Sequence, residues 1–582
     1  MSVIGIDLGT TNSLAAVWRN GKVELIPDAL GNLMTPSVVA LDGDGNILVG
    51  QAAKEEELHH PERCASSFKR FMGTEKKYSL GTREFTPEEL SALVLKRIKE
   101  MAEEYLQEEV TEAVISVPAY FNNDQRYATK QAAELAGIYC ERLINEPSAA
   151  ALAERQEKTE EEYLLVFDFG GGTLDVSLVD CFENIVEINT IAGDNHLGGT
   201  DFDQAIASYF CNAVGIMQNA LTPVQWSTLL LEARRCKETL SIQAEVEMCF
   251  VWKGNTYSQK LTPEDIFHAG KGLFLRIRDV VSKALMDGGL SPDDISKILL
   301  AGGSSCMPTV SLYLGKLFGR NIKAGTEPDY LIATGLGIYT GIKERKEEIK
   351  DIMMTDVCPF SLGVGTHFNN SDQEKMDILI ERNSILPSRM AKTYIAHTDY
   401  QESIRFEIYQ GEHYIPEKNL KIGTLDIEIP KAKKGEEEVV VTFSYDINGI
   451  LEVNAMNPST GNTANTTIVS GYRRLSQEQL EAQRGKIDGL KRLSKELEEQ
   501  KAIFAMGERL YAQTTGGLRD AVERTLDYYR CVCNSHSPIR IRKAGRGVLQ
   551  FFLNAEIQRK RTVFDTLEFQ WEDLFEESEE EQ

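Results

Sequence analysis

The sequence predicts a multi-domain protein with an α/β region, a strand-rich region and a helical C-terminal region. Residues 1 to about 350 alternate β-rich and helical segments, which is typical of α/β layers. The next part of the chain alternates apolar and polar residues, as a half-buried antiparallel sheet does, and the last part is mostly helical before an acidic end. These changes predict segments at 1–350, 351–356 (a linker), 357–472, 473–575 and 576–582, the last expected to be disordered.

The composition is that of a soluble globular protein. At 582 residues, 42% of them apolar, the chain is long enough for three or four domains with their own cores. No apolar run approaches the roughly 18 residues that a membrane span needs. The first strand begins almost at Met1, without a basic and apolar leader, so we expect a cytoplasmic rather than a secreted protein.

The charge excludes some partners. Lys and Arg number 63 against 89 Asp and Glu, so the formal net charge of −26 repels nucleic acid and anionic lipid. Neither nucleic acid nor a membrane is therefore expected as a partner. The ten cysteines are expected to be reduced thiols, and Cys531-Val532-Cys533 lacks the second pair or spaced His that a zinc site needs.

The first elements follow from residue patterns. Val3 to Ile6 is expected to be a strand, with Leu14 to Val17 as its hairpin partner. Ala113 to Val117 is a β-branched strand stopped by Pro118. A helix is expected from about Asp124 to Ala136, ending at Gly137.

Glycine turns next to acids are the chemically informative feature. Asp168 to Asp175 places Gly170, Gly171, Gly172 and Thr173 between two acids, and three glycines leave N–H groups free to face an anion. An ordinary Gly-rich hairpin is the alternative. A second copy at Ile4 to Asn12 favours two facing phosphate loops from a duplicated domain. No Gly-x4-Gly-Lys-Ser/Thr motif is present, so a P-loop does not explain phosphate binding.

Further motifs follow along the chain. Gly193 to Asp203 opens a helix after glycines, and Leu299 to Ser305 is another strand followed by a glycine turn. Glu146, before Pro147, begins a helix and could equally be a cap. Lys343 to Lys350 is expected to be a charged helical run, and the apolar residues after Asp351 form a linker that can dock.

The second half carries strand and helix patterns. Ser403 to Tyr409 and Leu425 to Ile429 alternate apolar and polar residues, and Asn448-Gly449 is a hairpin turn. Ser476 to Gln479 is a capping box that begins the helical part.

Four features, in this order and spacing, carry a resemblance to one family: the paired glycine turns, Asn145-Glu146-Pro147, Gly302-Gly303-Ser304, and a β region after an apolar linker. The sequence resembles the DnaK-like heat-shock-70 (Hsp70) chaperones over nearly its whole length, most closely the divergent bacterial HscC-type branch. The resemblance implies a two-lobed actin-like ATPase, a peptide-holding β-sandwich and a helical lid. It also implies slow Mg²⁺-dependent ATP hydrolysis that controls binding of unfolded proteins in folding and stress response.

The resemblance also assigns site residues. Mg²⁺, mostly through water, would be held by Asp7, Asp168 and Asp175. Lys69 would lie beside the γ-phosphate and Glu146 near the attacking water, completing a catalytic group with Asp168, Thr173 and Asp175. ATP or ADP would be bound by Asp7, Gly9, Thr10, Thr11, Gly170, Gly171, Gly172, Gly198, Gly199, Lys237, Ser241, Gly302, Gly303, Ser304 and Asp329.

The adenosine end departs from the family pattern. Where the family has two long side chains against the adenine this chain has Glu238 and Cys306, and where it has an acid for the ribose this chain has Arg234. Losing two stacking contacts of about 0.5–2 kcal/mol each weakens nucleotide binding. We therefore expect micromolar ATP affinity and rapid ADP release, with an exchange factor dispensable.

The resemblance places binding and coupling residues in the rest of the chain. The peptide-cleft positions, which could equally be sandwich core, are Leu362, Val364, Tyr394, Ile404 and Phe406, with His367 and His397 at unusual arch positions. Contacts between domains, or with a J-domain co-chaperone, would use Pro118, Arg126, Arg142, Asn145, Ile352, Met353, Met354 and Asp356.

Three other functions share the phosphate loops. A small-molecule kinase or a filament-forming ATPase on the same fold would have no use for the C-terminal half. An ATP-switched regulator of one specific folded partner, such as a transcription factor, would keep the whole chain. This last alternative stays open.

Overall fold

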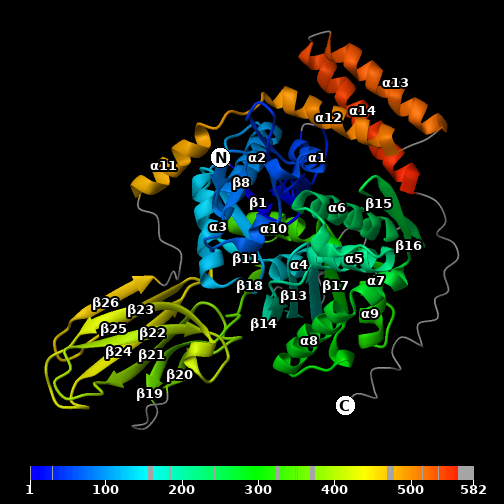
Figure 1. The fold of residues 1–582 in the computed structure, drawn as a ribbon. Coiled ribbons are helices and arrows are strands. Elements are labelled where there is room, and N and C mark those ends of the chain that lie inside the picture. Colours follow the sequence, from blue (N-terminus) through cyan, green and yellow to red (C-terminus); the bar gives the residue numbers. More distant parts are fainter. Residues whose placement is uncertain are drawn as a thin grey trace, which may run out of the picture. The chain divides into compact units, whose positions relative to one another are not determined.

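The computed structural model describes residues 2–28, 30–154, 162–182, 185–241, 243–322, 328–347, 349, 351–367, 374–467, 477–513, 516–534 and 537–560 (Figure 1). The chain divides into two compact units. The first holds residues 1–201, 272–306 and 311–502, and the second holds 202–271, 307–310 and 503–582. The segment boundaries expected from the sequence are not the boundaries of these units and stay predictions.

The first sheet of the first unit has the strand order β11-β10-β1-β2-β3, with β4 also paired to β2. In it β1 lies between an antiparallel neighbour, β2, and a parallel neighbour, β10. The hairpin expected at the N-terminus is confirmed, because Asp7 pairs with Leu14. The strands are β1 (Val3–Asp7), β2 (Asn12–Arg19), β3 (Lys22–Leu25), β4 (Thr35–Pro36), β10 (Glu112–Val117) and β11 (Leu143–Asn145).

A second sheet of this unit repeats the pattern, in the order β17-β12-β13-β14-β18. In it β12 lies between an antiparallel neighbour, β13, and a parallel neighbour, β17. This repetition agrees with the duplication inferred from the two glycine turns. The strands are β12 (Glu162–Phe169), β13 (Leu174–Phe182), β14 (Ile185–Asp194), β17 (Lys297–Ala301) and β18 (Met353–Thr355).

Helices pack against these sheets. A Cβ on Gly335 would lie 1.8 Å from the carbonyl oxygen of Ala149, so α4 and α10 can approach this closely only because position 335 is glycine. The expected helix before Gly137 is confirmed as α3, and Gly137 has φ +72°. The helices are α2 (Pro87–Leu106), α3 (Asn123–Leu135), α4 (Glu146–Glu154), α8 (Lys271–Gly288), α9 (Pro308–Leu317) and α10 (Leu331–Lys343).

The described residues of the charged run after α10 are not helical, contrary to expectation. The helix ends at Lys343, and Arg345 adopts φ +54°, a left-handed conformation that stops an α-helix. Smaller elements complete this part of the unit: β5 (Val39–Leu41), β6 (Ile47–Val49), α1 (Gln51–His59), β7 (Cys64–Ala65), β8 (Tyr78–Leu80) and β9 (Arg83–Phe85).

The strand-rich region forms two four-stranded sheets, β20-β19-β22-β23 and β21-β24-β25-β26. Apolar side chains from both sheets share one buried core, among them Val364 and Ile408 from one sheet and Val441 and Phe443 from the other. The strands are β19 (Leu362–His367), β20 (Glu374–Ile380), β21 (Ser388–Ile395), β22 (Ser403–Gln410), β23 (Leu420–Glu428), β24 (Glu438–Tyr445), β25 (Leu451–Met456) and β26 (Thr463–Thr467).

The described part of the C-terminal region, residues 477–513, 516–534 and 537–560, is mostly helical, as expected. Its helices are α11 (Gln477–Asp488), α12 (Lys495–Gln513), α13 (Gly516–Cys533) and α14 (Pro538–Lys560). The expected cap at Ser476, the end of the helical region at residue 575 and the acidic tail 576–582 lie outside the described residues. In the described part of the chain, no helix is both long and apolar enough to cross a membrane.

The second unit is built on α5 (Gly199–Val214), α6 (Pro223–Leu240), the hairpin β15 (Val246–Trp252) and β16 (Asn255–Leu261), and α7 (Pro263–Ala269). A Cβ on Gly270 would lie 2.7 Å from Phe202, so the start and the end of this chain excursion are packed together. All ten cysteines of the chain are free thiols.

Candidate functional site

The two glycine turns of the first unit contact each other. A Cβ on Gly171 would lie 2.1 Å from Thr11 Oγ1, and one on Gly172 would lie 3.1 Å from Thr10 Cγ2. Gly9 is as tightly enclosed, because a Cβ there would lie 2.0 Å from the carbonyl oxygen of Asn12. The two turns therefore face one another across a space that admits backbone but no side chain.

Three acids stand at the strand ends beside these turns. Asp7 ends β1, and Asp168 and Asp175 are direct cross-strand partners on β12 and β13. They are 7%, 5% and 1% exposed, so all three carboxyls are buried. The Ser116 hydroxyl donates to Asp7 at 2.7 Å, and the Tyr120 N–H donates to Asp175 at 3.0 Å.

A buried ion pair stands with these acids. Lys69 Nζ donates to Glu146 Oε1 at 2.7 Å, and the two side chains are 4% and 8% exposed. Lys69 comes from a short helical turn, Phe68–Phe71, and Glu146 is the first residue of α4. The ammonium also lies 5.6 Å from the centre of the Phe121 ring.

The carboxyls titrate abnormally because they are buried together. Burial, and then the nearby Glu146 charge, raise the pKa of Asp7 and of Asp175 to about 7. The same causes raise the pKa of Asp168 well above its ordinary range. Several acids and one lysine thus form a site with a deficit of positive charge.

A divalent cation fits this deficit. Carboxylate oxygens are the ligands that Mg²⁺ prefers, and Asp175 Oδ2 is buried without a hydrogen-bond partner in the described part of the chain. The described residues contain no group of three His, Cys, Asp or Glu side chains that could hold a metal ion by themselves. Contact through water therefore stays the prediction for Asp7, Asp168 and Asp175.

Two further glycine segments are hydrogen-bonded to the Gly170–Gly172 turn. Ser304 Oγ donates to the carbonyl of Gly170 at 2.7 Å, and Gly302 adopts φ +77° directly against Phe169 and Asp168. The N–H of Gly199 also donates to the Gly170 carbonyl, at 3.0 Å. A Cβ on Gly198 would lie 2.4 Å from the nitrogen of Gly172, and one on Gly303 would lie 3.1 Å from Asp329 Oδ1.

The structure thus gathers most predicted phosphate, magnesium and catalytic residues in the first unit. It brings together the segments that hold Asp7 to Thr11, Lys69, Glu146, Asp168 to Asp175, Gly198 and Gly199, and Gly302 to Ser304 with Asp329. Thr173 is 8% exposed within the turn, where its carbonyl accepts from the N–H of Gly170 at 3.1 Å.

The remaining predicted adenosine residues lie on α6 of the second unit. Asp203 pairs there with Lys237 at 2.6 Å and with Arg234 at 3.1 Å. Arg234, the unexpected cation, is thus held by the acid that also holds Lys237. Ser241 caps the C-terminal end of α6. In the first unit, burial and the charge of Asp329 raise the pKa of Cys306 to about 11, so this thiol is protonated at neutral pH.

The predicted coupling residues meet the strand-rich region. Arg126 Nη2 donates to Asn145 Oδ1 at 2.8 Å, and its Nη1 donates to the carbonyl of Asn448 at 3.4 Å. Arg142 donates to the carbonyl of Ile447. Pro118, which begins the turn after β10, accepts from the N–H of Phe121 at 3.1 Å.

Part of the predicted linker forms a strand in the second sheet. Met353 to Thr355 form β18, which pairs parallel to β14 in the register Ile185 with Met353. Ile352 is 7% exposed, Met353 is 60% exposed and Met354 is partly buried against the core. Ser148 Oγ donates to Asp356 Oδ1 at 2.6 Å. The expectation that this segment can dock is confirmed.

The predicted peptide-cleft residues lie in the core of the strand-rich region. Leu362, Val364, Ile404 and Phe406 are at most 9% exposed. Tyr394 is partly buried, its ring centre lies 5.4 Å from that of Phe406 in a tilted contact, and its hydroxyl donates to Asp377. The alternative that these side chains are sandwich core describes their position, and their contact with a peptide stays a prediction. His397 is exposed, and the side chain of His367 lies outside the described residues.

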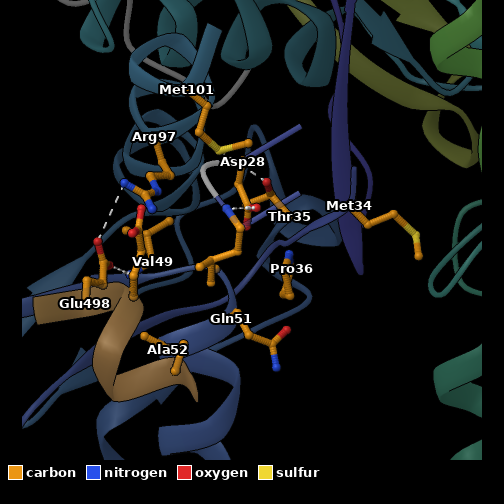
Figure 2. Close-up of a pocket in the computed structure, with 14 residues that line it drawn as sticks. Asp28, Met34, Thr35, Pro36, Val49, Gln51, Ala52, Arg97, Met101 and Glu498 are labelled. Atoms are coloured by element: carbon orange, nitrogen blue, oxygen red, sulfur yellow. Dashed lines mark hydrogen bonds and ion pairs between the residues drawn. The ribbon is translucent and has the colours of Figure 1, made fainter. Parts of the chain in front are cut away.

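Some contacts were not expected from the sequence. Lys501 on α12 donates to the buried Asp42 at 2.9 Å. Arg97 and Glu498, which pair at 3.7 Å, are among the residues that line a cavity of about 30 Å³ (Figure 2). A cavity of this size holds about one water molecule. The contacts that Arg70 makes were also not expected from the sequence. Each of these pairs joins distant parts of the chain, and no local sequence pattern marks them.

A family comparison agrees with this geometry. The model of the Hsp70 protein family matches residues 3–80 and 75–528, which is most of the chain. The matched ranges contain all the glycine turns, the acids, Lys69 and Glu146, and the strand-rich region. The chain therefore belongs to the Hsp70 family, whose members are ATP-dependent chaperones.

Proposed function

We propose that this protein is an Hsp70-type chaperone in which slow Mg²⁺-dependent hydrolysis of ATP controls the binding of extended apolar segments of client proteins. One observation carries the proposal: two glycine turns face each other next to three buried acids and the buried Lys69–Glu146 pair. Such an arrangement suits phosphoryl transfer to water, which needs positioning and charge neutralisation more than a strong base.

The residues of the first unit have distinct roles in this proposal. The glycine N–H groups, with Thr10, Thr11 and Thr173, bind the phosphates. Lys69 neutralises charge beside the terminal phosphate, and Glu146, fixed by Lys69, orients the attacking water. Asp7, Asp168 and Asp175 hold Mg²⁺ through water, and when bound the ion offsets charge on the phosphates.

Coupling to the strand-rich region runs through the linker and the turn at Asn448. β18 pairs with β14, whose last residues pair with β13 at Asp175 and Leu174. A change of phosphate state at Asp175 therefore reaches the linker along the length of β14, from Gly193 to Glu187. Because binding free energies are reciprocal, a client that favours release of the linker also changes nucleotide binding.

The adenosine end supports a short nucleotide dwell time. Arg234 and Lys237 share Asp203, and neither Glu238 nor Cys306 offers a cationic face for stacking. We propose micromolar nucleotide affinity and ADP release without an exchange factor. We also propose that a J-domain co-chaperone is a partner and that the chain is most similar to the HscC-type branch. An equilibrium titration that gives low-nanomolar dissociation constants would contradict the proposed micromolar affinity.

A second function has support from the peptide-cleft positions. Tyr394 is hydrogen-bonded to Asp377, and His397 is exposed, so the cleft region is more polar than an aliphatic slot. An ATP-switched regulator of one specific partner would suit such a region.

ATPase measurements test the main proposal. Lys69→Met should lower the steady-state hydrolysis rate at least about a hundredfold. Lys77→Met is the matched control, because Lys77 is 63% exposed and pairs only with the exposed Glu84 among its described contacts. A wild-type chain that neither binds nor hydrolyses ATP would overturn the proposal.

A pull-down separates the two functions. Thr173→Ala should slow hydrolysis and hold clients in one nucleotide state. Comparison with wild type should recover a broad set of apolar peptides if the protein is a general chaperone. Recovery of one dominant folded partner would instead favour the regulator.

A further inference from the structure

Arg70 projects from a rigid turn next to the catalytic lysine. The turn Phe68–Phe71 follows Ser67, which adopts φ +54°, and Phe68 and Met72 anchor it in the core with 2% and 0% exposure. Because successive residues of a 3₁₀ turn point about 120° apart, Lys69 and Arg70 reach different partners. Lys69 reaches Glu146, whereas Arg70 reaches the segment that opens α5.

The guanidinium holds that segment with two nitrogens. Nη1 donates to Thr200 Oγ1 at 2.6 Å, and Nη2 donates to Asp201 Oδ2 at 3.2 Å. The Arg70 side chain is 11% exposed and that of Asp201 is 19% exposed. Nε is buried and has no hydrogen-bond partner in the described ranges, so the two terminal nitrogens alone fix the group. This pair is too buried to be an ordinary solvated surface pair.

The same contacts reach the phosphate turn. The N–H and the hydroxyl of Thr200 both donate to the carbonyl of Gly171, each at 2.9 Å. Asp201 Oδ2 accepts from the N–H of Gly198 at 2.7 Å. A Cβ on Gly172 would lie 2.7 Å from Arg70 Cγ and Cδ, so the side chain also lies directly on this turn.

These bonds fix the direction of a peptide N–H. In a trans peptide the C=O and the N–H point in opposite directions. Because the Gly171 carbonyl points at Thr200, the N–H of Gly172 points away from Thr200. Thr200 and Asp201 are also the last residues of the first unit before the chain enters the second.

We propose that Arg70 is a positioning residue for bound nucleotide: through Thr200 and Asp201 it holds the Gly170–Gly172 turn with its N–H groups toward the phosphates. This inference rests on the proposed ATPase function. Arg70 does not itself act on the reacting atoms, which are left to Lys69, Glu146 and the three acids.

The test is nucleotide binding and hydrolysis by Arg70→Met and Arg70→Lys in the full-length chain. Arg70→Met should raise KM for ATP and the ADP dissociation rate about tenfold, or about 1.4 kcal/mol, while kcat changes less than about threefold. Arg70→Lys keeps the charge but not the two-armed fork and should recover part of the loss. Arg278→Met is the control, because Arg278 is about half exposed and pairs with its neighbour Asp279.

A double-mutant cycle tests the route through Asp201. Asp201→Asn should speed ADP release in wild type but add little in Arg70→Met. An ADP dissociation rate in Arg70→Met within about twofold of wild type, measured below the unfolding temperature of both proteins, would overturn the inference. So would a fall in kcat as large as the rise in KM. A wild-type chain that does not bind ATP would instead overturn the proposed function itself.

Discussion

At the scale of single residues, the site depends on positions where no side chain fits. Gly198 is the clearest, because a Cβ there would meet the backbone nitrogen and α-carbon of Gly172 at 2.4 and 2.5 Å. Backbone atoms cannot rotate aside as a flexible side chain can. The two segments can therefore pack in this way only while residue 198 is glycine.

Gly198→Ala should accordingly weaken nucleotide binding. We expect at least about a tenfold rise in the ADP dissociation constant and a loss of about 1–3 kcal/mol of stability from the forced backbone shift. Isothermal titration and thermal unfolding measure the two effects. Gly547→Ala is the matched control, since a Cβ there meets nothing within 4 Å and replaces a helical glycine. That change should be neutral or stabilising by up to about 1 kcal/mol.

Asp42 gives a pH-dependent prediction. Burial alone would raise the pKa of this carboxyl, but hydrogen bonds from Asn46 and Lys501 outweigh burial and lower the pKa to about 2. A lowered pKa in the folded state stabilises the protein above the ordinary value of about 4, and this contribution is lost as pH falls toward 2.

Asp42→Asn should therefore lower the free energy of unfolding by about 1–2 kcal/mol at pH 7, a figure that allows for the half-exposed Lys501. This difference from wild type should shrink as pH falls below about 4. Thermal unfolding from pH 7 to pH 3 measures it. Lys431→Met, which breaks the exposed pair with Glu402, is the control and should leave the unfolding temperature unchanged. An Asp42→Asn effect that grows on acidification would contradict the sign.

At the scale of elements, the linker strand separates two neighbouring methionines. Met354 packs against the core, whereas Met353 is 60% exposed. The backbone of both residues pairs with β14, so the strand presents one side chain inward and one outward.

Met354→Asp should uncouple peptide binding from ATP hydrolysis, because a buried carboxylate disfavours the docked strand. We expect the stimulation of ATPase rate by saturating peptide to fall below about twofold. Met353→Asp is the matched control and should keep most of the stimulation, whereas the double variant should resemble Met354→Asp. If peptide stimulated the Met354→Asp chain normally, β18 would not be the coupling element.

Local elements were predictable because their causes are local. The hairpin of β1 and β2, the stop of α3 at Gly137 and the turn at Asn448-Gly449 follow from alternation and from residues that favour φ > 0. The prediction of a helical run after Lys343 was wrong, because charge composition does not indicate the left-handed conformation at Arg345. The pairing of Lys501 with Asp42 spans 459 residues, so only the packed structure shows it.

At the scale of the whole molecule, the turn at Asn448 joins the strand-rich region to the rest of the first unit. Leu143 donates its N–H to Asn448 Oδ1 at 3.0 Å, and Leu451 donates its N–H to Asn123 Oδ1 at 2.9 Å. Asn448 is 7% exposed, so its amide is largely withdrawn from water.

Asn448→Ala should loosen this junction, because it leaves the buried N–H of Leu143 without an acceptor at a cost of about 1–3 kcal/mol. Hydrogen exchange in β11 and β25 should become faster by about tenfold or more. Asn462→Ala, on an exposed turn of the same region, is the control and should leave both strands protected. Unchanged exchange in the Asn448→Ala protein would show that this turn does not hold the junction.

The geometry of the candidate phosphate site was more predictable than the rest, because each of its segments carries its own glycines and acids. The same strand pattern recurs around Asp7 and Asp168, and this repeat predicted that the two turns face each other. The cleft residues and Arg70 were less predictable, because burial and a guanidinium's choice of acceptor depend on chain segments far apart in sequence. The roles of Leu362 and its neighbours in binding a client stay predictions.

The docked linker has a consequence for solubility. With β18 in place, the outer edge of its sheet is a strand of only three residues. β18 pairs with only Ile185 to Glu187 of the ten-residue β14, and when β18 leaves, the backbone groups of these three residues lose their partners. A long uncovered edge is a template for pairing with another chain. The state that frees the linker segment therefore lengthens the uncovered edge by three residues, which favours self-association.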